Sequence, residues 1–208
     1  AAIAAKTEAI AEEALLKINV EYEVLTPVMD VNDAMEAGAP LLHEDMYTSG
    51  LPEKPSDPSN VANRMELKKG DVEQGFAEAD EIVEREYYSP TVHQGYIEPH
   101  ACTVRWDEDG QSLIWCSTQG HFGVRGITAG VLGTPLSRIK VVAAEIGGGF
   151  GGKTVVYLEP VALVLSRKAG RPVKMVMTRE EVFRASGPGS AARNWVKIGA
   201  KKDGTITA

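Results

Sequence analysis

Hydrophobic and polar positions recur along the chain with two different periods, which predicts a mixture of helices and strands. Helical spacing over 4–18 predicts an amphipathic helix, with Glu13 and Lys17 as an i,i+4 ion pair. Its apolar stripe would consist of Ile3, Ile10, Ala14, Leu15 and Ile18. Strict alternation over 19–24 then predicts a strand whose inward-facing residues are Val20, Tyr22 and Val24.

The rest of the chain carries further strand and helix signals, separated by turn residues. Strands are predicted over 61–67, 81–88, 102–106, 112–117, 139–144 and 172–177. Helices are predicted over 72–79, 122–132 and 160–168, with glycines at 133 and 170 ending the last two. Asp71 and Thr178 stand where N-caps are expected, Thr178 before a short helix. Residues 107–110 predict a hairpin turn, and 195–208 predict a closing hairpin.

A segment rich in Gly, Pro, Ser, Asp and Asn interrupts these patterns at 38–60, which is the composition of a linker. We therefore divide the chain into 1–37, a linker at 38–60, and 61–208. Helices and strands do not alternate regularly, so the predicted fold class is α+β, in two unequal parts.

The composition, 43% hydrophobic and 25% charged, is that of a soluble globular protein. No apolar run approaches the roughly 20 residues that a membrane span needs, so no membrane association is expected. The net charge of −7 is uneven: residues 1–50 carry 2 basic and 10 acidic residues, and 153–208 carry 11 and 4. An acidic front half argues against nucleic acid as a partner.

Two cysteines, Cys102 and Cys116, are too few for an iron–sulfur cluster. Their predicted strands could lie side by side, so a disulfide is geometrically conceivable. A reduced pair in a cytoplasmic protein is the favoured interpretation, because a chain this long needs no covalent staple.

The glycine-rich run Gly147-Gly148-Gly149-Phe150-Gly151-Gly152-Lys153 is the most informative feature of the sequence. Glycines let the backbone take positive φ and approach a ligand closely, and successive amides can point at an anion. Considered by itself, the run is also compatible with a structural turn or a variant dinucleotide loop. Its spacing matches neither a phosphate loop nor G-x-G-x-x-G.

Three co-linear motifs carry a family resemblance: Glu98-Pro99-His100, Ser117-Thr118-Gln119 and the glycine run from 146 to 153. Gly133, Pro135, Arg138 and Ile139 lie between them, and 159–162, 170–173 and 178–179 continue the pattern. In order and spacing the chain resembles the large subunit of molybdenum hydroxylases, the xanthine dehydrogenase and aldehyde oxidase superfamily. The resemblance implies that 1–37 is the end of a hammerhead domain and that 61–208 is the first part of a molybdopterin-binding domain.

The resemblance also implies roles for individual residues. Gln119 matches a glutamine whose amide lies beside an oxo ligand of the metal, and an amide can donate a hydrogen bond there. Gly149, Phe150 and Gly151 match the loop that lies against the metal and the pterin. In this family the cofactor's sulfurs hold the metal, so no protein metal ligand is expected. A zinc site built from His93, Glu98 and His100 fits no standard spacing, and a packed turn is the better interpretation.

One position departs from the purine-oxidising members, which carry a glutamate where this chain has Thr154. That difference argues against a purine substrate and leaves aldehydes, other N-heterocycles, carbon monoxide and aromatic thioesters open. The family's general base is a glutamate that falls beyond residue 208, so no carboxylate of this chain is expected to fill its role.

The resemblance thus implies a cytoplasmic oxidoreductase that hydroxylates a carbon centre of a small molecule with oxygen derived from water. Its cofactor would be molybdenum-molybdopterin, in a plain or cytosine dinucleotide form. Iron–sulfur and FAD subunits or domains would take the electrons, and the full-length enzyme would be oligomeric. An alternative is a non-catalytic binding or assembly module of the same fold. A nucleotide-binding module is a third possibility, but no acid stands about 20 residues beyond the loop to hold a ribose.

Backbone geometry adds an expectation of its own. The chain must reverse between the strand at 139–144 and the helix at Pro160, so at least one glycine of the run should have positive φ. Phe150, the only bulky residue of the run, should keep negative φ.

Overall fold

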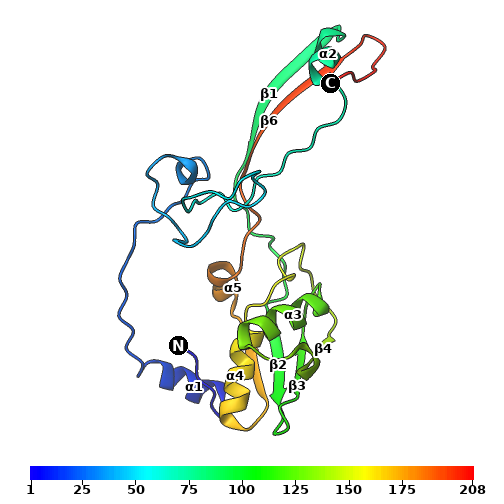
Figure 1. Ribbon diagram of the computed structural model, residues 1–208. Coiled ribbons are helices and arrows are strands. Elements are labelled where there is room, and N and C mark those ends of the chain that lie inside the picture. Colours follow the sequence, from blue (N-terminus) through cyan, green and yellow to red (C-terminus); the bar gives the residue numbers. More distant parts are fainter. The chain divides into compact units, whose positions relative to one another are not determined.

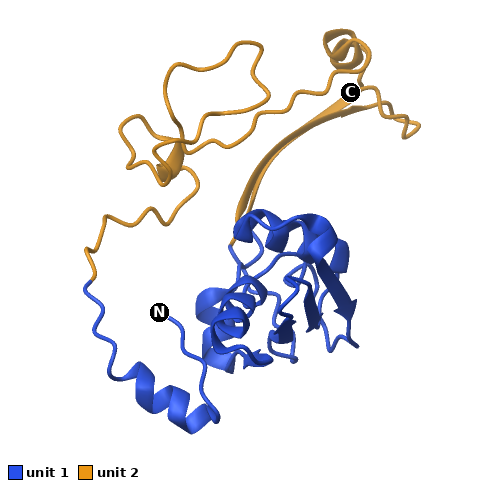
Figure 2. Ribbon diagram, turned by 60° about the horizontal axis from the view of Figure 1, so that its bottom comes forward, with its two compact units in different colours: residues 1–21, 91–190 blue, residues 22–90, 191–208 orange.

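The computed structural model describes residues 1–208, which form two compact units. Unit 1 contains residues 1–21 and 91–190, and unit 2 contains 22–90 and 191–208, as coloured in Figure 2. No helix is long and apolar enough to cross a bilayer.

Unit 1 is built on a four-stranded sheet with the order β4-β3-β2-β5 (Figure 1). The hairpin of β2 (Ala101–Trp106) and β3 (Ser112–Cys116) forms its centre. β5 (Val173–Val176) pairs antiparallel with β2, and β4 (Ile139–Ala143) pairs parallel with β3. The parallel pair needs a crossover connection, which α3 (His121–Leu132) supplies.

Two helices cover one face of this sheet. α3 packs against β4, and α4 (Glu159–Ala169) packs against β2 and β5. The core between them consists of Cys102, Val104, Ile114, Cys116, Val124, Ala129, Ile139, Ala162 and Leu163. The predicted ends of both helices are confirmed, since Gly133 and Gly170 take left-handed conformations there. The sequence of α4 is apolar almost all round at 161–165, yet Val161 and Val164 are about 40% exposed, so only one face of the helix is buried.

Several other predicted elements of unit 1 are present with small shifts. The hairpin turn at 107–110 is confirmed by the amide of Asp107 donating to the carbonyl of Gln111. Thr178 caps α5 (Arg179–Ala185) in a capping box with Glu181. A short 3₁₀ turn, η2 (Leu136–Arg138), precedes β4.

The two cysteines lie directly opposite each other on β2 and β3, as the side-by-side strands allowed. Both are free thiols in the core. Burial raises the pKa of each to about 12, with the nearby Glu159 as a further cause. The reactive thiolate is therefore strongly disfavoured at this position.

The first helix is shorter than predicted. α1 runs over Glu8–Leu15 after an N-cap at Thr7, and none of its residues is buried. The predicted ion pair between Glu13 and Lys17 is confirmed at 3.4 Å. The strand predicted over 19–24 is wrong, because this segment pairs with no other strand. Alternation marks a segment that can be half-buried in a sheet, and without a partner it stays irregular.

Unit 2 contains a two-stranded antiparallel ribbon of β1 (Glu81–Ser89) and β6 (Ala192–Ala200), paired from Glu81↔Ala200 to Ser89↔Ala192. α2 (Val72–Ala77), capped by Asp71, packs against β6. The predicted closing hairpin is confirmed: Ala200 and Ile206 form an antiparallel bridge. The amide of Lys201 donates to the carbonyl of Thr205, and the amide of Gly199 donates to the carbonyl of Ala208, both at 2.8 Å.

The segment from 36 to 71 is irregular apart from a bridge between Ser49 and Asn63, and it follows the short turn η1 (Asp33–Met35). The strand predicted over 61–67 is therefore wrong: Met65 and Leu67 are at least 90% exposed and unpaired. The division at 38–60 into two family domains stays a prediction, because the compact units reflect contacts within this chain alone.

Candidate cofactor-binding site

The glycine loop, residues 147–153, connects β4 with the segment leading to α4 in unit 1. Gly148 has φ 101° and Gly151 has φ 91°, so the predicted positive φ is confirmed. The amide of Gly152 donates to the carbonyl of Gly149 at 2.7 Å, which closes a four-residue turn.

Phe150 departs from its prediction, because its φ is +49°. Phe150 and Gly151 are the two central residues of the turn closed by Gly149 and Gly152, and both have positive φ, as a type I′ turn requires. The expectation of negative φ assumed that glycines alone would make the reversal. The aromatic side chain is 75% exposed, so it is not held there by burial.

The other glycines of the loop are required by close approach. A Cβ on Gly149 would lie 2.5 Å from Gln119 Oε1. A Cβ on Gly147 would lie 2.8 Å from the Cβ of Glu98, and one on Gly152 would lie 2.6 Å from the Tyr96 ring. Such distances leave no room for a methyl group, so the loop is packed tightly against three side chains.

Gln119 lies at the end of β3, and its side chain reaches across to the loop. Oε1 accepts hydrogen bonds from the amides of Gly151 at 2.9 Å and Lys153 at 3.2 Å. Since both neighbours are donors, the amide oxygen has to face them. The Nε2 group donates no hydrogen bond within the chain, and Gln119 is an exposed residue, so this amide nitrogen stays available as a donor to a bound group.

Three successive loop amides, those of Gly148, Gly149 and Phe150, donate no hydrogen bond within the chain. Gly149 is moreover a buried residue. Buried backbone N–H groups are almost always paired, so an unpaired one marks a place where an acceptor is expected. The Gln119 donor, the free amides and the exposed Phe150 ring together fit a group that carries acceptor atoms and contacts the backbone closely.

A buried ion pair lies beneath the loop. Lys153 Nζ donates to Glu98 Oε2 at 2.7 Å, and the lysine side chain is 0% exposed. Nζ is also 3.5 Å from Ser117 Oγ and 5.1 Å from the centre of the Tyr96 ring. Burial opposes ionisation of Glu98, but hydrogen bonds from Lys153 and Gly147 outweigh it, and the pKa of this carboxyl lies below its ordinary value.

The two histidines considered for zinc belong to a hydrogen-bonded network around Tyr96. The Tyr96 hydroxyl is 2.7 Å from His100 Nε2 and donates to Ser186 Oγ at 3.2 Å. His93 Nε2 lies 3.0 Å from Ser186 Oγ. Burial, and then the charge of Lys153, lowers the pKa of His100 to about 4. His100 is thus neutral near pH 7, and the network ties the segment before β2 to the end of α5.

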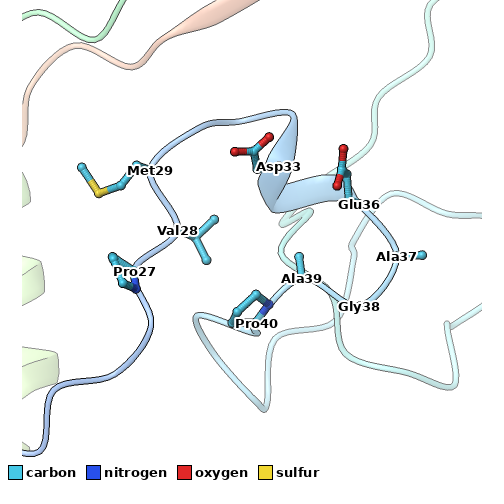
Figure 3. Close-up of a pocket in the computed structure, with 9 residues that line it drawn as sticks. All are labelled: Pro27, Val28, Met29, Asp33, Glu36, Ala37, Gly38, Ala39 and Pro40. Atoms are coloured by element: carbon cyan, nitrogen blue, oxygen red, sulfur yellow. The ribbon is translucent and has the colours of Figure 1, made fainter.

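A separate pocket lies in unit 2, between Pro27 and Pro40 (Figure 3). Its lining is mostly small and apolar, with the carboxylates of Asp33 and Glu36 as the charged groups. It contains none of the residues that the sequence motifs singled out, and we assign it no role.

The structure brings Gln119 into contact with the loop that contains Gly149, Phe150 and Gly151, although 30 positions separate Gln119 from Gly149. The sequence did not assign a role to Glu98 or to the buried Lys153. A lysine that directly follows the glycine run was the sequence signal for this cation. Its partner could not be found from spacing, because it stands 55 positions earlier.

Comparison with known proteins identifies the family. The molybdopterin cofactor-binding domain matches residues 53–208. The probable hypoxanthine oxidase XdhD of Escherichia coli K12 is 38% identical over 232 aligned positions, covering all of this chain and 24% of that protein. The nicotinate dehydrogenase large molybdopterin subunit of Eubacterium barkeri is 33% identical and is covered to 46%.

Solved structures of similar proteins support the same family assignment. The aldehyde oxidoreductase of Desulfovibrio gigas superposes with a TM-score of 0.80 at 27% identity, over 97% of this chain and 21% of that one. The chain thus spans about a quarter of most of these relatives, which are longer proteins. The resemblance of the three motifs is confirmed, and the chain belongs to the molybdopterin cofactor-binding domain family of the xanthine dehydrogenase and aldehyde oxidase proteins.

Proposed function

We propose that this chain supplies part of the cofactor cradle of a molybdenum hydroxylase. The full-length protein hydroxylates a carbon centre of a small molecule, an aldehyde or an N-heterocycle, with oxygen derived from water. The observation that carries the proposal is the fixed amide of Gln119, whose Oε1 is held by two loop amides while Nε2 has no hydrogen-bond partner within the chain. The cofactor, when bound, supplies the two-electron redox chemistry.

The chain's own residues contribute binding and orientation. The free amides of Gly148, Gly149 and Phe150 would face the acceptor atoms of the cofactor, and Gln119 Nε2 would donate to an oxygen on the metal. Phe150 would form a wall beside the reacting centre. No carboxylate of this site is free to act as a base, since Glu98 is engaged by Lys153 and Gly147. The general base therefore belongs to another part of the full-length protein.

Thr154 supports a substrate other than a purine. Its hydroxyl donates to the carbonyl of Gly151 at 3.0 Å, so this side chain is turned to the loop and offers no carboxylate to orient a purine ring. The names of the relatives include both a purine and a non-purine substrate, because one is a probable hypoxanthine oxidase and another a nicotinate dehydrogenase. Comparing hypoxanthine, nicotinate and benzaldehyde as substrates of the full-length enzyme decides between these classes.

The same proposal includes the surroundings of the site. Residues 1–37 would complete a hammerhead domain, and the cofactor is molybdenum-molybdopterin, with the cytosine dinucleotide form as one option. Electrons would leave through iron–sulfur and FAD subunits or domains in an oligomeric cytoplasmic enzyme. Relatives named as subunits of nicotinate and xanthine dehydrogenases support a multi-subunit assembly.

Two variants of Gln119 test the proposal in the full-length enzyme. Gln119→Ala removes both the accepting oxygen and the donor, and the loss of a contact to a charged group, about 1.5–3 kcal/mol, should lower turnover per molybdenum by more than about tenfold. Gln119→Glu keeps an oxygen for Gly151 and Lys153 but lacks the Nε2 donor. Turnover per molybdenum in Gln119→Glu should fall by a similar factor, while the amides of the loop stay protected from hydrogen exchange.

Gln111→Ala is the matched control, because Gln111 is exposed and its side chain makes no hydrogen bond. It should retain full turnover. Normal turnover of both Gln119 variants at full metal content would contradict the proposed role, and a full-length protein that binds no molybdenum would favour a non-catalytic module of the same fold.

A further inference from the structure

Two side-chain oxygens hold the glycine loop, one at each side. Glu98 Oε2 accepts from the amide of Gly147 at 2.5 Å and from Lys153 Nζ at 2.7 Å. One carboxylate oxygen thus binds the first and the last residue of the loop. Gln119 Oε1 accepts from Gly151 and Lys153 and fixes the second half.

Lys153 connects the two holding points. Its backbone amide donates to Gln119 Oε1, and its carbonyl accepts from the amide of Gln119 and from Thr118 Oγ1, both at 3.0 Å. Its side chain ends on Glu98. A displacement of the Lys153 backbone therefore also displaces the side-chain amide group of Gln119.

The charge of Lys153 makes this connection sensitive to Glu98. The ammonium is 0% exposed, and Glu98 is its only ion-pair partner. A buried cation that loses its counter-charge either gives up its proton or moves toward solvent. Moving the ammonium outward would pull on the backbone that Gln119 holds. The side chain of Glu98 is 30% exposed, so the carboxylate is in partial contact with solvent while its partner Lys153 is not.

From this geometry we propose that Glu98 is a positioning residue: its carboxylate sets the conformation of the loop and thereby the direction of the Gln119 amide. The inference rests on the proposed function, since it deepens the role of that site. Glu98 does not touch the reacting atoms and acts through Lys153.

The first test uses the metal-free full-length protein and needs no activity. Hydrogen exchange followed by mass spectrometry measures the peptide spanning 146–155 in Glu98→Ala and Glu98→Gln. Both variants should exchange the Gly151 and Lys153 amides at least about tenfold faster, because their acceptor has moved. The β2–β3 hairpin should exchange at its normal rate.

The second test uses the loaded enzyme. Turnover per molybdenum should fall by about tenfold or more in Glu98→Gln, with KM changed by less than about threefold, because the orientation of Gln119 changes and the substrate's own contacts do not. The double variant Glu98→Gln with Lys153→Met removes both charges, and it should regain part of the turnover that Glu98→Gln loses.

Glu180→Gln is the control for losing a carboxylate, because Glu180 forms an exposed i,i+4 pair with Arg184 in the same unit. Normal loop exchange in both Glu98 variants would overturn the proposal. So would a loss of turnover that follows metal content alone, or no recovery in the double variant. If Gln119→Ala has normal turnover while the Glu98 variants still exchange the loop amides faster, the proposed function is wrong. The role of Glu98 in positioning the loop is then still supported.

Discussion

Phe150 has a backbone conformation that a residue with a Cβ seldom takes, and the strain amounts to about 1–2 kcal/mol. Burial does not compensate for it, because the ring is 75% exposed. Strain of this kind persists where the surrounding structure over-determines it, often at sites that act on a ligand. Asparagine tolerates positive φ better and could occupy the same turn.

We therefore expect Phe150→Asn in the full-length enzyme to keep its molybdenum content while KM for the substrate rises several-fold, because a wall of the site is lost. Steady-state kinetics with metal analysis measures both. Phe122→Asn, which alters a phenylalanine that is 74% exposed on α3, should leave KM unchanged. An unchanged KM with reduced metal content in Phe150→Asn would instead assign the ring a structural role.

At the scale of elements, helix ends and turns were predicted correctly from local residues, whereas two of the predicted strands have no partner in the structure. Helices ended by Gly133 and Gly170, and the capped start at Thr178, depend on residues within one turn, so the sequence contains their cause. The segments predicted as strands at 19–24 and 61–67 require a partner strand, which a pattern of side chains cannot supply. The ion pair of Glu98 and Lys153 was hidden for the same reason, since only the folded sheet brings its two residues together.

Ser166 provides a test of how α4 is joined to the sheet. Its buried hydroxyl donates to the carbonyl of Arg171 at 2.7 Å and accepts from the amide of Trp106 at 3.0 Å. Ser166→Ala leaves both groups without that partner and should lower the free energy of unfolding by about 1–3 kcal/mol.

Ser112→Ala offers the matched comparison, because the Ser112 hydroxyl is buried but has no hydrogen-bond partner. Removing this hydroxyl should leave the free energy of unfolding unchanged or slightly higher, and urea titrations of the two variants measure both changes. Equal destabilisation by the two substitutions would show that the side-chain volume matters and the hydrogen bonds do not.

At the scale of the whole molecule, the ribbon of unit 2 has little to stabilise it. Every residue of β1 is exposed, and Tyr87, Tyr88 and Trp195 are each more than half exposed. A two-stranded ribbon is at best marginally stable in water, and large apolar side chains on it call for further protein surface. The relatives have that additional length.

On the proposed function, much of the cradle and the general base would be supplied by other parts of the full-length protein, so the 208-residue chain by itself should retain no stoichiometric molybdenum and show no dye-linked turnover. Elemental analysis and an assay with an artificial electron acceptor measure this directly. One molybdenum per chain after purification, or turnover by this chain, would contradict the expectation.

The close packing of the glycine loop also constrains how such a protein can diverge. A larger residue at position 149 fits only if the Gln119 side chain moves or is replaced, and the same dependence links 147 to Glu98 and 152 to Tyr96. Gly151 has no neighbour within 4 Å of its missing Cβ, so its backbone conformation alone restrains it. Substitutions at 147, 149 and 152 are thus expected to be epistatic with distant positions, whereas position 151 needs glycine because of its own φ of 91°, whatever residues surround it.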